Sequence, residues 1–506
     1  MLRTLRRTIA TVVFVLLTLL FLDFTGTLQA WFGWLAKVQF IPAILAGSAI
    51  LIAAVCVFTL VFGRVYCSVV CPLGVMQDGI SHISGRRKGK KNRFSFSKPV
   101  TWLRLVVLVL FVAGFVAGMS AVVSLLDPYA AYGRIASSFL APLYGLGNNV
   151  LAWLNAKAGG YALYPTEVFV KSWVVFGVAL VTLVAVGVLA WRNGRTYCNT
   201  ICPVGSFLGV FSSFAIFRPM FDFDKCTKCG LCEKGCKASC INSKVQTIDL
   251  NRCVGCFNCI EKCSFDAMHY RPVWRSAETK RTEPSVKSAP TSETAKKGVS
   301  RRTFLSIATL FTVGGSLKAQ QLHVDGGLAE IEDKKVPNRK TPVTPPGAVG
   351  AAHLKAHCSA CQLCVSECPN NVLHPSARLA TLMQPEMTFE RGYCRPECTN
   401  CSQVCPTGAI RPITPADKTA TAIGHAVWIA DNCIVNRDGV QCTACSGHCP
   451  AGAIALVALD PTSEKSLKIP VVNKEMCIGC GACEYLCPAR PFAAIYVEGN
   501  ERHHTV

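Results

Sequence analysis

The sequence predicts an α-helical membrane domain followed by small α+β domains that bind metal, and three observations support this fold class. Of the 506 residues, 51% are hydrophobic and only 16% are charged, a composition that favours a membrane protein. The long apolar runs all lie in the first 200 residues. Among the 30 cysteines, most fall into tightly spaced groups of four beyond that apolar region, which indicates metal ligation more than a disulfide framework.

Four uncharged apolar runs define the predicted membrane domain. They cover roughly Thr8–Leu22, Phe40–Gly63, Leu105–Leu126 and Ser172–Trp191. The last three reach the ~20 residues that a bilayer-spanning helix needs. The first run is shorter, and we interpret it as an anchor because no small-residue cleavage site follows it. We therefore expect a four-span domain over residues 1–215.

The basic residues set the expected orientation of this domain. Clusters of Arg and Lys lie at residues 3–7 and 86–93, whereas the loop before the fourth run has only Arg134, Lys157 and Lys171. Because Lys and Arg are enriched on the cytoplasmic side, both ends of the four-span unit are expected in the cytoplasm. The same bias accounts for the net charge of +22 without a nucleic-acid partner.

Two cysteine groups after the membrane domain repeat the pattern C-x2-C-x2-C-x3-C. They are Cys226, Cys229, Cys232 and Cys236, then Cys253, Cys256, Cys259 and Cys263. Bacterial ferredoxins have this spacing, and their fourth cysteine ligates the other of two [4Fe–4S] clusters. We expect Cys263 to complete the first cluster and Cys236 the second, with Cys240 close enough to replace Cys236. Residues 216–270 should thus form a βαββαβ domain with two clusters. Zinc fits this spacing less well, because zinc sites favour two separated C-x2-C pairs.

Four further groups lie in residues 350–499, and a Pro follows the last cysteine of each, as in ferredoxins. They are Cys358, Cys361, Cys364, Cys368; Cys394, Cys398, Cys401, Cys405; Cys433, Cys442, Cys445, Cys449; and Cys477, Cys480, Cys483, Cys487. We expect a four-cluster domain in which the first group pairs with the fourth and the second with the third. The chain would then hold about six clusters.

A repeated segment follows the second and the fourth apolar runs. It reads R-x-Y-C-x3-C-P-x-G and supplies Cys67 and Cys71 at its first occurrence, Cys198 and Cys202 at its second. Buried, inert thiols at two helix ends are one interpretation. We favour a four-cysteine redox or metal site formed where the two loops meet on the cytoplasmic side, near a membrane quinone. Whether this site holds a further cluster stays open.

These motifs resemble two families. The first 270 residues resemble the NapH/MauN family of membrane quinol dehydrogenase components, through both C-x3-C-P loops and the ferredoxin pair that follows. Residues 300–499 resemble the MauM/NapG family of exported four-cluster ferredoxins, including the C-x8-C-x2-C-x3-C spacing of Cys433–Cys449. The resemblance implies a fusion in which the membrane part oxidises quinol and the second part supplies a periplasmic reductase or cytochrome.

The segment Ser300–Leu305, at the start of residues 300–318, looks like a twin-arginine export motif between two linkers, residues 271–299 and 319–349. The first linker has a composition typical of disorder. The motif is internal and no A-x-A cleavage site follows it, so we expect a fifth anchor. The chain would lie in the bacterial inner membrane as a multi-pass protein, with its first ferredoxin domain cytoplasmic and its last domain periplasmic.

The predicted function is electron transfer between the quinone pool and a partner reductase. No G-x-G-x-x-G or G-x4-G-K-[ST] motif signals a dinucleotide or ATP site. The chain is therefore expected to conduct electrons, oxidising quinol without a complete substrate site of its own. The alternative is a redox maturation or regulatory factor for a metalloenzyme, which needs a reductant without sustained turnover.

Overall fold

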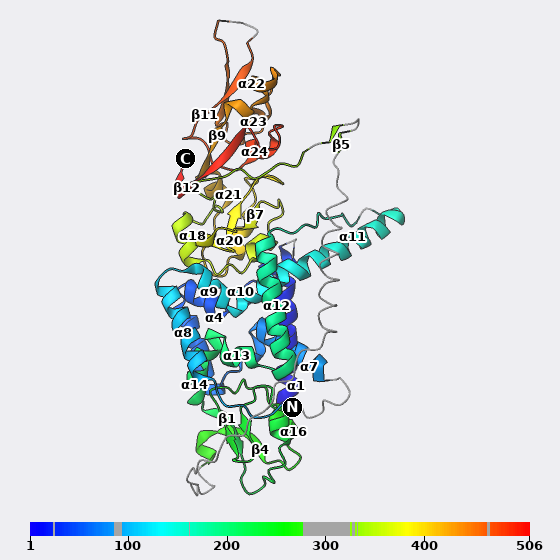
Figure 1. Ribbon diagram of the computed structural model, residues 1–506, viewed down its shortest axis with the longest axis vertical. Helices are drawn as coiled ribbons and strands as arrows, with labels where there is room; N and C mark the ends of the chain where they lie inside the picture. Colours follow the sequence, from blue (N-terminus) through cyan, green and yellow to red (C-terminus); the bar gives the residue numbers. More distant parts are fainter. Residues whose placement is uncertain are drawn as a thin grey trace, which may run out of the picture.

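The computed structural model describes residues 1–23, 26–85, 94–160, 162–276, 332–462 and 466–506, together with the short paired strands β5 (Val324–Asp325) and β6 (Ala329–Glu330). A body of helices occupies the middle of an elongated molecule, with one cysteine-rich domain at each end (Figure 1). Residues 277–323, which hold most of the first predicted linker and the whole twin-arginine-like segment, lie outside the described residues.

The helical body contains a helix or a helix pair at each predicted span. The first is α1 (Leu2–Leu20) and the last is α12 (Trp173–Asn193). The second run is divided into α4 (Phe40–Leu45) and α5 (Ala49–Phe62), and the third into α8 (Thr101–Val116) and α9 (Ser120–Leu126).

A glycine at positive φ lies in each break, Gly47 at 67° and Gly118 at 67°, and this conformation commonly ends a helix. Among the described residues, α12 alone is long and apolar enough to cross a membrane, whereas α5 and α8 are shorter apolar helices. Of the four predicted spans, one therefore corresponds to a candidate membrane-spanning helix among the described residues, and the other three remain predictions.

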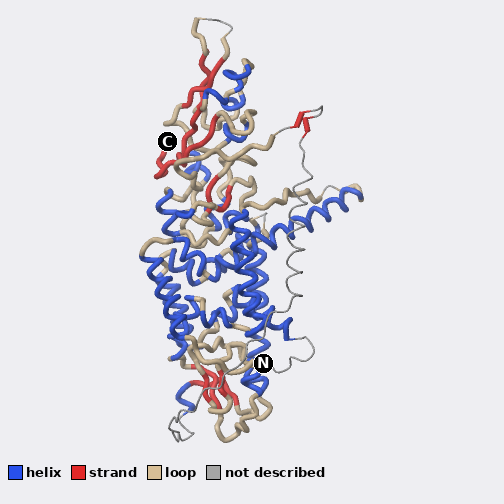
Figure 2. The backbone as a smooth tube through the Cα atoms, viewed as in Figure 1, coloured by secondary structure: helices blue, strands red, loops and turns tan. Residues whose placement is uncertain are grey.

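Further helices connect these elements. They are α2 (Thr27–Phe32), α3 (Trp34–Lys37), α6 (Tyr66–Val69), α7 (Pro72–Gly85), α10 (Pro128–Ile135), the π-helix η1 (Ala136–Leu140), α11 (Ala141–Lys157), α13 (Thr196–Thr200) and α14 (Pro203–Ser213). Helix α11 projects sideways from the body (Figure 2). Helix α10 is buried along its entire length, including Arg134, one of the three basic residues counted in the expected loop before the fourth run.

The first cysteine-rich domain has the predicted βαββαβ order. Its elements are β1 (Phe217–Phe221), α15 (Leu231–Lys234), β2 (Ile241–Asn242), β3 (Thr247–Ile248), α16 (Asn258–Lys262) and β4 (Met268–Pro272), followed by the short 3₁₀ turn η2 (Val273–Ser276). Strand β1 pairs antiparallel with β4, and β2 with β3. This domain has a small hydrophobic core of its own, formed largely by cysteines.

The carboxyl-terminal domain consists of two cysteine-rich units. The first unit has α18 (Ala351–His357), α19 (Leu363–Ser366), β7 (Leu373–Pro375), η3 (Leu379–Thr381), β8 (Pro385–Met387) and α20 (Asn400–Val404), and α21 (Pro415–Thr419) leads to the second. The second has β9 (Thr421–Trp428), η4 (Ala430–Asn432), α22 (Ile434–Asp438), α23 (Ala444–Gly447), β10 (Ile454–Ala458), β11 (Lys468–Val472), α24 (Ala482–Leu486) and β12 (Ile495–Thr505). One hydrophobic core continues from the helical body into this domain.

Small cavities lined by cysteines show how the groups combine. In the first domain, one cavity is lined by Cys226, Cys229, Cys232 and Cys263, and another by Cys253, Cys256, Cys259, Cys236 and Cys240. The exchange of the fourth cysteine between the two groups therefore occurs as expected. Cys236 and Cys240 lie 3.5 Å apart, sulfur to sulfur, so both remain candidate ligands.

In the carboxyl-terminal domain the expected pairing of groups is wrong. Cys368 of the first group lines a cavity with Cys394, Cys398 and Cys401 of the second, and Cys487 of the fourth lines one with Cys433, Cys442 and Cys445 of the third. Helix α19 packs on α20, and α23 on α24. Each pair of consecutive groups forms one unit, because the short hairpins β7–β8 and β10–β11 fold neighbouring groups against each other.

This pairing predicts which cysteine losses are additive. The single variant Cys398→Ala should lose one cluster, about four iron atoms, and Cys368→Ala/Cys398→Ala should lose no more, because both cysteines serve the same cluster. The matched pair Cys364→Ala/Cys398→Ala should lose about eight. Iron and acid-labile sulfide per chain measure the effect. Loss of about four iron atoms in Cys368→Ala/Cys480→Ala would instead support pairing of the first group with the fourth.

Candidate functional site

The two C-x3-C-P loops come together inside the helical body. Each begins at a short helix, α6 or α13, that carries the Tyr-Cys pair, and each continues into a longer helix, α7 or α14, whose first residue is the Pro. Proline suits this position because its fixed φ matches a helix and the missing N–H has no partner there. Cys202 caps α14, its sulfur accepting a hydrogen bond from the Gly205 N–H at 3.3 Å.

The arginine of each repeat binds the other repeat. Arg195 donates to the carbonyl of Cys67 at 2.7 Å, and Arg64 donates to the carbonyl of Cys198 at 3.2 Å. Both arginines have no exposed surface. The repeats are thus joined by two reciprocal contacts of one kind, which gives the site an approximate twofold symmetry.

The glycine that ends each repeat leaves room for the arginine of the other repeat. A Cβ at Gly74 would lie 2.6 Å from a guanidinium nitrogen of Arg195, and one at Gly205 would lie 2.7 Å from a guanidinium nitrogen of Arg64. Both positions would also crowd the carbonyl of the first cysteine of their own loop. The R-x-Y-C-x3-C-P-x-G pattern is therefore explained by the packing of the two loops.

The four thiols of Cys67, Cys71, Cys198 and Cys202 are buried and lie within electrostatic range of one another. Nitrogen donors face the sulfurs: Gln77 Nε2 lies 3.3 Å from the Cys198 sulfur, and Arg64 lies 3.9 Å from the Cys67 sulfur. Burial raises the pKa of the Cys71 and Cys202 thiols well above their usual value. Without a ligand that displaces their protons, these thiols are neutral.

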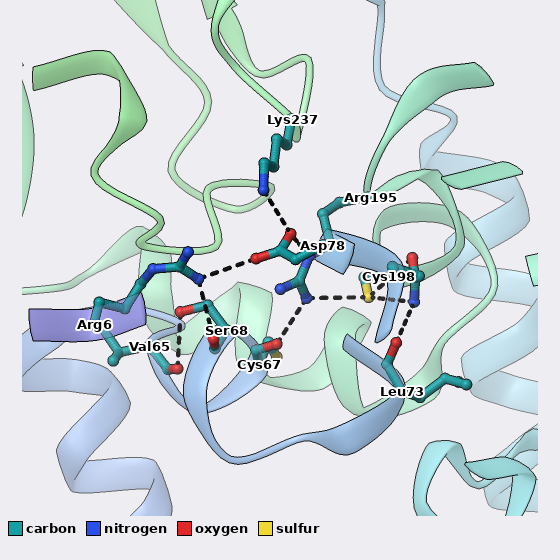
Figure 3. Close-up of polar contacts among 10 residues, drawn as sticks. Arg6, Val65, Cys67, Ser68, Leu73, Asp78, Arg195, Cys198 and Lys237 are labelled. Atoms are coloured by element: carbon teal, nitrogen blue, oxygen red, sulfur yellow. Dashed lines mark hydrogen bonds and ion pairs between the residues drawn. The ribbon is translucent and has the colours of Figure 1, made fainter. Parts of the chain in front are cut away.

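Buried positive charge surrounds the thiols. Asp78 of α7 accepts from Arg195 at 2.9 Å and from Arg6 at 3.0 Å, and Lys237 of the first ferredoxin domain lies 3.4 Å away (Figure 3). Burial alone would raise the pKa of Asp78, but the charges of Arg195 and Lys237 outweigh it and hold that pKa well below its usual range. The Asp78 carboxylate thus forms ion pairs with three cations from three parts of the chain.

Among the described residues, Arg64 has no carboxylate partner. Its described partners are the Asn199 Oδ1, the carbonyls of Asn251 and Cys198, and the Cys67 sulfur, all of them uncharged while the thiols are protonated. A buried charge is costly unless an opposite charge compensates it. The arrangement therefore suits an anionic group at the four sulfurs, and a [4Fe–4S] cluster with four thiolates is such a group.

No group of three or more His, Cys, Asp or Glu converges as around a single ion within the described part of the chain. The cysteines of the two ferredoxin regions do not converge in this way either, although their spacing indicates clusters. A cluster takes one cysteine on each of four irons, so its ligands surround a volume and need not meet at a point. The donor set of the four-cysteine site fits a cluster on the same grounds.

The four-cysteine site lies between the two ferredoxin regions. Gly255, between two cysteines of the first domain, lies against Val65 of the loop. On the other side is α10, where Gly133 lies against the carbonyl of Cys361. Tyr129 of α10 is within electrostatic range of both Tyr66 and Cys361. The repeat motif pointed to the cysteines and arginines, but Gln77, Asp78 and Tyr129 were missed because they lie outside the repeated pattern.

The order of the cysteine groups continues through the carboxyl-terminal domain. Cys358, Cys361 and Cys364 lie within electrostatic range of Cys405, and Cys477 and Cys480 within range of Cys449. The backbone N–H of Cys394 donates to the carbonyl of Cys480 at 2.9 Å and so joins the two units. The groups thus form one series from the first domain, through the four-cysteine site, to Cys433 and its partners.

The Asp78 network predicts a large loss of stability when its carboxylate is removed. Asp78→Asn should lower the free energy of unfolding by roughly 3–5 kcal/mol, because three buried cations lose their anion. Thermal unfolding in detergent measures this. The control Asp438→Asn breaks the exposed pair with Arg437 and should change the free energy of unfolding little, because solvent screens an exposed pair. Equal losses in the two variants would contradict the role given to Asp78.

Comparison with known proteins identifies iron–sulfur families in two regions. A 4Fe-4S binding domain family matches residues 44–91 and 175–219, the two segments that contain the C-x3-C-P loops. A 4Fe-4S dicluster domain family matches residues 440–490 in the carboxyl-terminal domain. No solved structure matches the chain.

Three curated relatives are ferredoxin-type proteins. The methylamine utilization ferredoxin-type protein MauM of Methylophilus methylotrophus is 30% identical over 40% of this chain and 85% of its own length. MauM of Methylobacillus flagellatus is 32% identical over 32% of this chain and 70% of its length. The ferredoxin-type protein NapF of Escherichia coli is 28% identical over 31% of this chain and 87% of its length. The chain therefore belongs to the MauM family of ferredoxin-type proteins and is an iron–sulfur electron-transfer protein.

Proposed function

We propose that the chain carries electrons between the membrane quinone pool and a partner reductase or cytochrome, through clusters on both sides of the membrane. The single observation that supports this most strongly is the series of cysteine groups along the molecule. It begins at Cys226 in the first domain, passes the four-cysteine site inside the helical body, and ends near Cys433 in the last domain. Clusters at these positions would supply one-electron transfer.

The outer surface of the helical body supports a membrane location. Large apolar side chains are exposed along α1, α5, α8 and α12, among them Val12, Phe58, Leu105, Val109 and Val181. Contiguous exposed apolar surface of this kind marks contact with lipid or protein. We infer that the divided runs α4–α5 and α8–α9 complete four passes together with α1 and α12.

The ends of these helices support an orientation with the two ferredoxin regions on opposite sides. Arg3 at the start of α1 forms an ion pair with Glu261 of the first domain. The backbone N–H of Arg195, just after α12, donates to the Lys237 carbonyl of the same domain. Lys171, just before α12, donates to the Val365 carbonyl of the last domain. By the distribution of basic residues, the first domain is cytoplasmic and the last is periplasmic.

The four-cysteine site is proposed to hold a seventh cluster that links the two regions. Arg64 and Arg195 compensate its negative charge, and Gln77 and the Gly205 N–H donate to its sulfurs. Hydrogen bonds to the sulfurs and burial both tune the potential of such a centre. Tyr66 and Tyr197 pack beside the cysteines, and with α10 they fill the space toward Cys361.

A quinol assay tests the proposed function. Anaerobic protein mixed with a soluble quinol such as menadiol should show reduced clusters by visible absorption and by EPR, because quinol is the proposed donor. In Cys67→Ser/Cys198→Ser, reduction of the first-domain clusters by quinol should slow at least tenfold, since the link to them is broken.

Signals of the first domain are assigned from Cys229→Ala and Cys256→Ala, which lack those clusters. Dithionite serves as the control for intact clusters, because it reaches them directly. Failure of quinol to reduce wild-type protein that dithionite reduces would contradict the quinone link. Unchanged reduction of the first domain in the double serine variant would contradict the linking role of the loops.

A further inference from the structure

A cavity of about 190 Å³ lies between the helical body and the carboxyl-terminal domain. Its walls are η1 with the start of α11, the segment 166–172 with the first turn of α12, and the loop of the first carboxyl-terminal cysteine group. One water molecule occupies about 30 Å³ in the liquid. The cavity therefore has room for a small organic group, and it is formed by segments far apart in the sequence.

One wall of the cavity carries buried polar atoms without a partner. Gln362 is 2% exposed, and its Nε2 donates to the Met383 carbonyl, which fixes the orientation of the amide. Within the described part of the chain, the Oε1 of Gln362 and the hydroxyl of Ser366 have no hydrogen-bond partner. Both residues line the cavity. Since unsatisfied buried acceptors are rare in proteins, these atoms indicate a ligand that can donate a hydrogen bond.

The cavity joins an apolar surface to a cysteine group. Val175 and Phe176 of the candidate membrane span line it, and the neighbouring Trp173 and Leu143 are exposed. On the opposite wall, Gln362 lies between Cys361 and Cys364 in the chain. A ligand here would enter from lipid and lie beside cluster ligands. The adjoining π-helix η1 is a rare conformation that frequently occurs at functional sites.

We propose that this cavity binds the head group of a lipid-soluble quinone. The inference rests on the proposed function and gives it a location, on the side of the carboxyl-terminal domain. It replaces the expectation that quinone reacts at the C-x3-C-P loops, whose thiols are enclosed by α10, the arginines and the first ferredoxin domain. Apolar walls hold the ring, and polar atoms at the cysteine-bearing wall hold one of its oxygens.

The chemistry balances with groups at the cavity. Oxidation would break the two O–H bonds of the quinol, and clusters held by the cysteines of the carboxyl-terminal domain would accept its two electrons one at a time. Gln362 Oε1 accepts a hydrogen bond from one hydroxyl, and the ammonium of Lys171 stabilises that oxygen as its proton leaves. Glu167 lines the cavity with a side chain that is 69% exposed, so its carboxylate passes the protons to water. Quinone reduction is the same sequence reversed.

The test uses full-length protein with its clusters, in lipid nanodiscs. Ser138→Phe places a phenyl ring in the cavity, and Leu151→Phe adds one to the exposed face of α11 as the matched control. We expect an azidoquinone to photolabel peptides within residues 137–176 in the wild type and in Leu151→Phe. Labelling should be lost in Ser138→Phe, with menadiol-driven cluster reduction at least tenfold slower and dithionite reduction unchanged.

Gln362→Leu keeps the shape of the side chain and removes the acceptor, so it should weaken quinone binding at unchanged iron content. Three outcomes would each overturn the location. They are labelling at the C-x3-C-P loops, a phospholipid retained in the cavity in native mass spectrometry, and a Ser138→Phe protein that behaves like Leu151→Phe. Wild-type protein that binds no quinone and is not reduced by quinol would instead contradict the proposed function itself.

Discussion

Burial of positive charge around four thiols is the constraint on which the rest of the structure depends. Arg64 and Arg195 are completely buried, and each reaches across to the opposite C-x3-C-P loop. Asp78 connects this pair of loops to α1 through Arg6 and to the first ferredoxin domain through Lys237. A buried charge tolerates little displacement, so the helices and the first domain are held in one relative position by these contacts.

That position determines how electrons can move along the chain. Because the loops lie between Gly255 of the first domain and α10, the cysteines of both ferredoxin regions are brought toward a common point inside the helices. Helix α10 is buried throughout, and it separates the loops from Cys361 by side chains and not by solvent. One hydrophobic core continues from the helices into the carboxyl-terminal domain along this path, and the low dielectric of such a core strengthens the electrostatic contacts within it.

Local sequence patterns predicted the parts of this protein whose geometry is local. The C-x2-C-x2-C spacing fixed three cysteines around one small cavity, and the βαββαβ order of the first domain followed from two such groups. The partner of each fourth cysteine in the last domain was not predictable, since it depends on which groups fold together. Cys368 joins Cys394 because of the β7–β8 hairpin, which no cysteine spacing encodes.

Tertiary burial also explains the other differences. Arg134 is a lone charge in a weakly charged stretch and was counted in the loop between the third and fourth runs, yet it lies in a buried helix and donates to the Ser124 carbonyl. The apolar runs gave no sign of the helix breaks at Gly47 and Gly118, because hydropathy does not register the φ of one residue. The cavity beside Gln362 combines residues from four distant segments, a juxtaposition that exists only in the folded chain.

The central claim is that the C-x3-C-P loops hold a cluster that completes the series, and iron analysis tests it most directly. Iron and acid-labile sulfide would be measured in anaerobically purified wild type, in Cys198→Ala, and in Cys56→Ala, whose cysteine lies in α5 outside every group. The account predicts about 28 iron atoms per chain in the wild type and in Cys56→Ala, and about 24 in Cys198→Ala. About 24 in all three proteins would mean that the loops hold no cluster and would contradict the account.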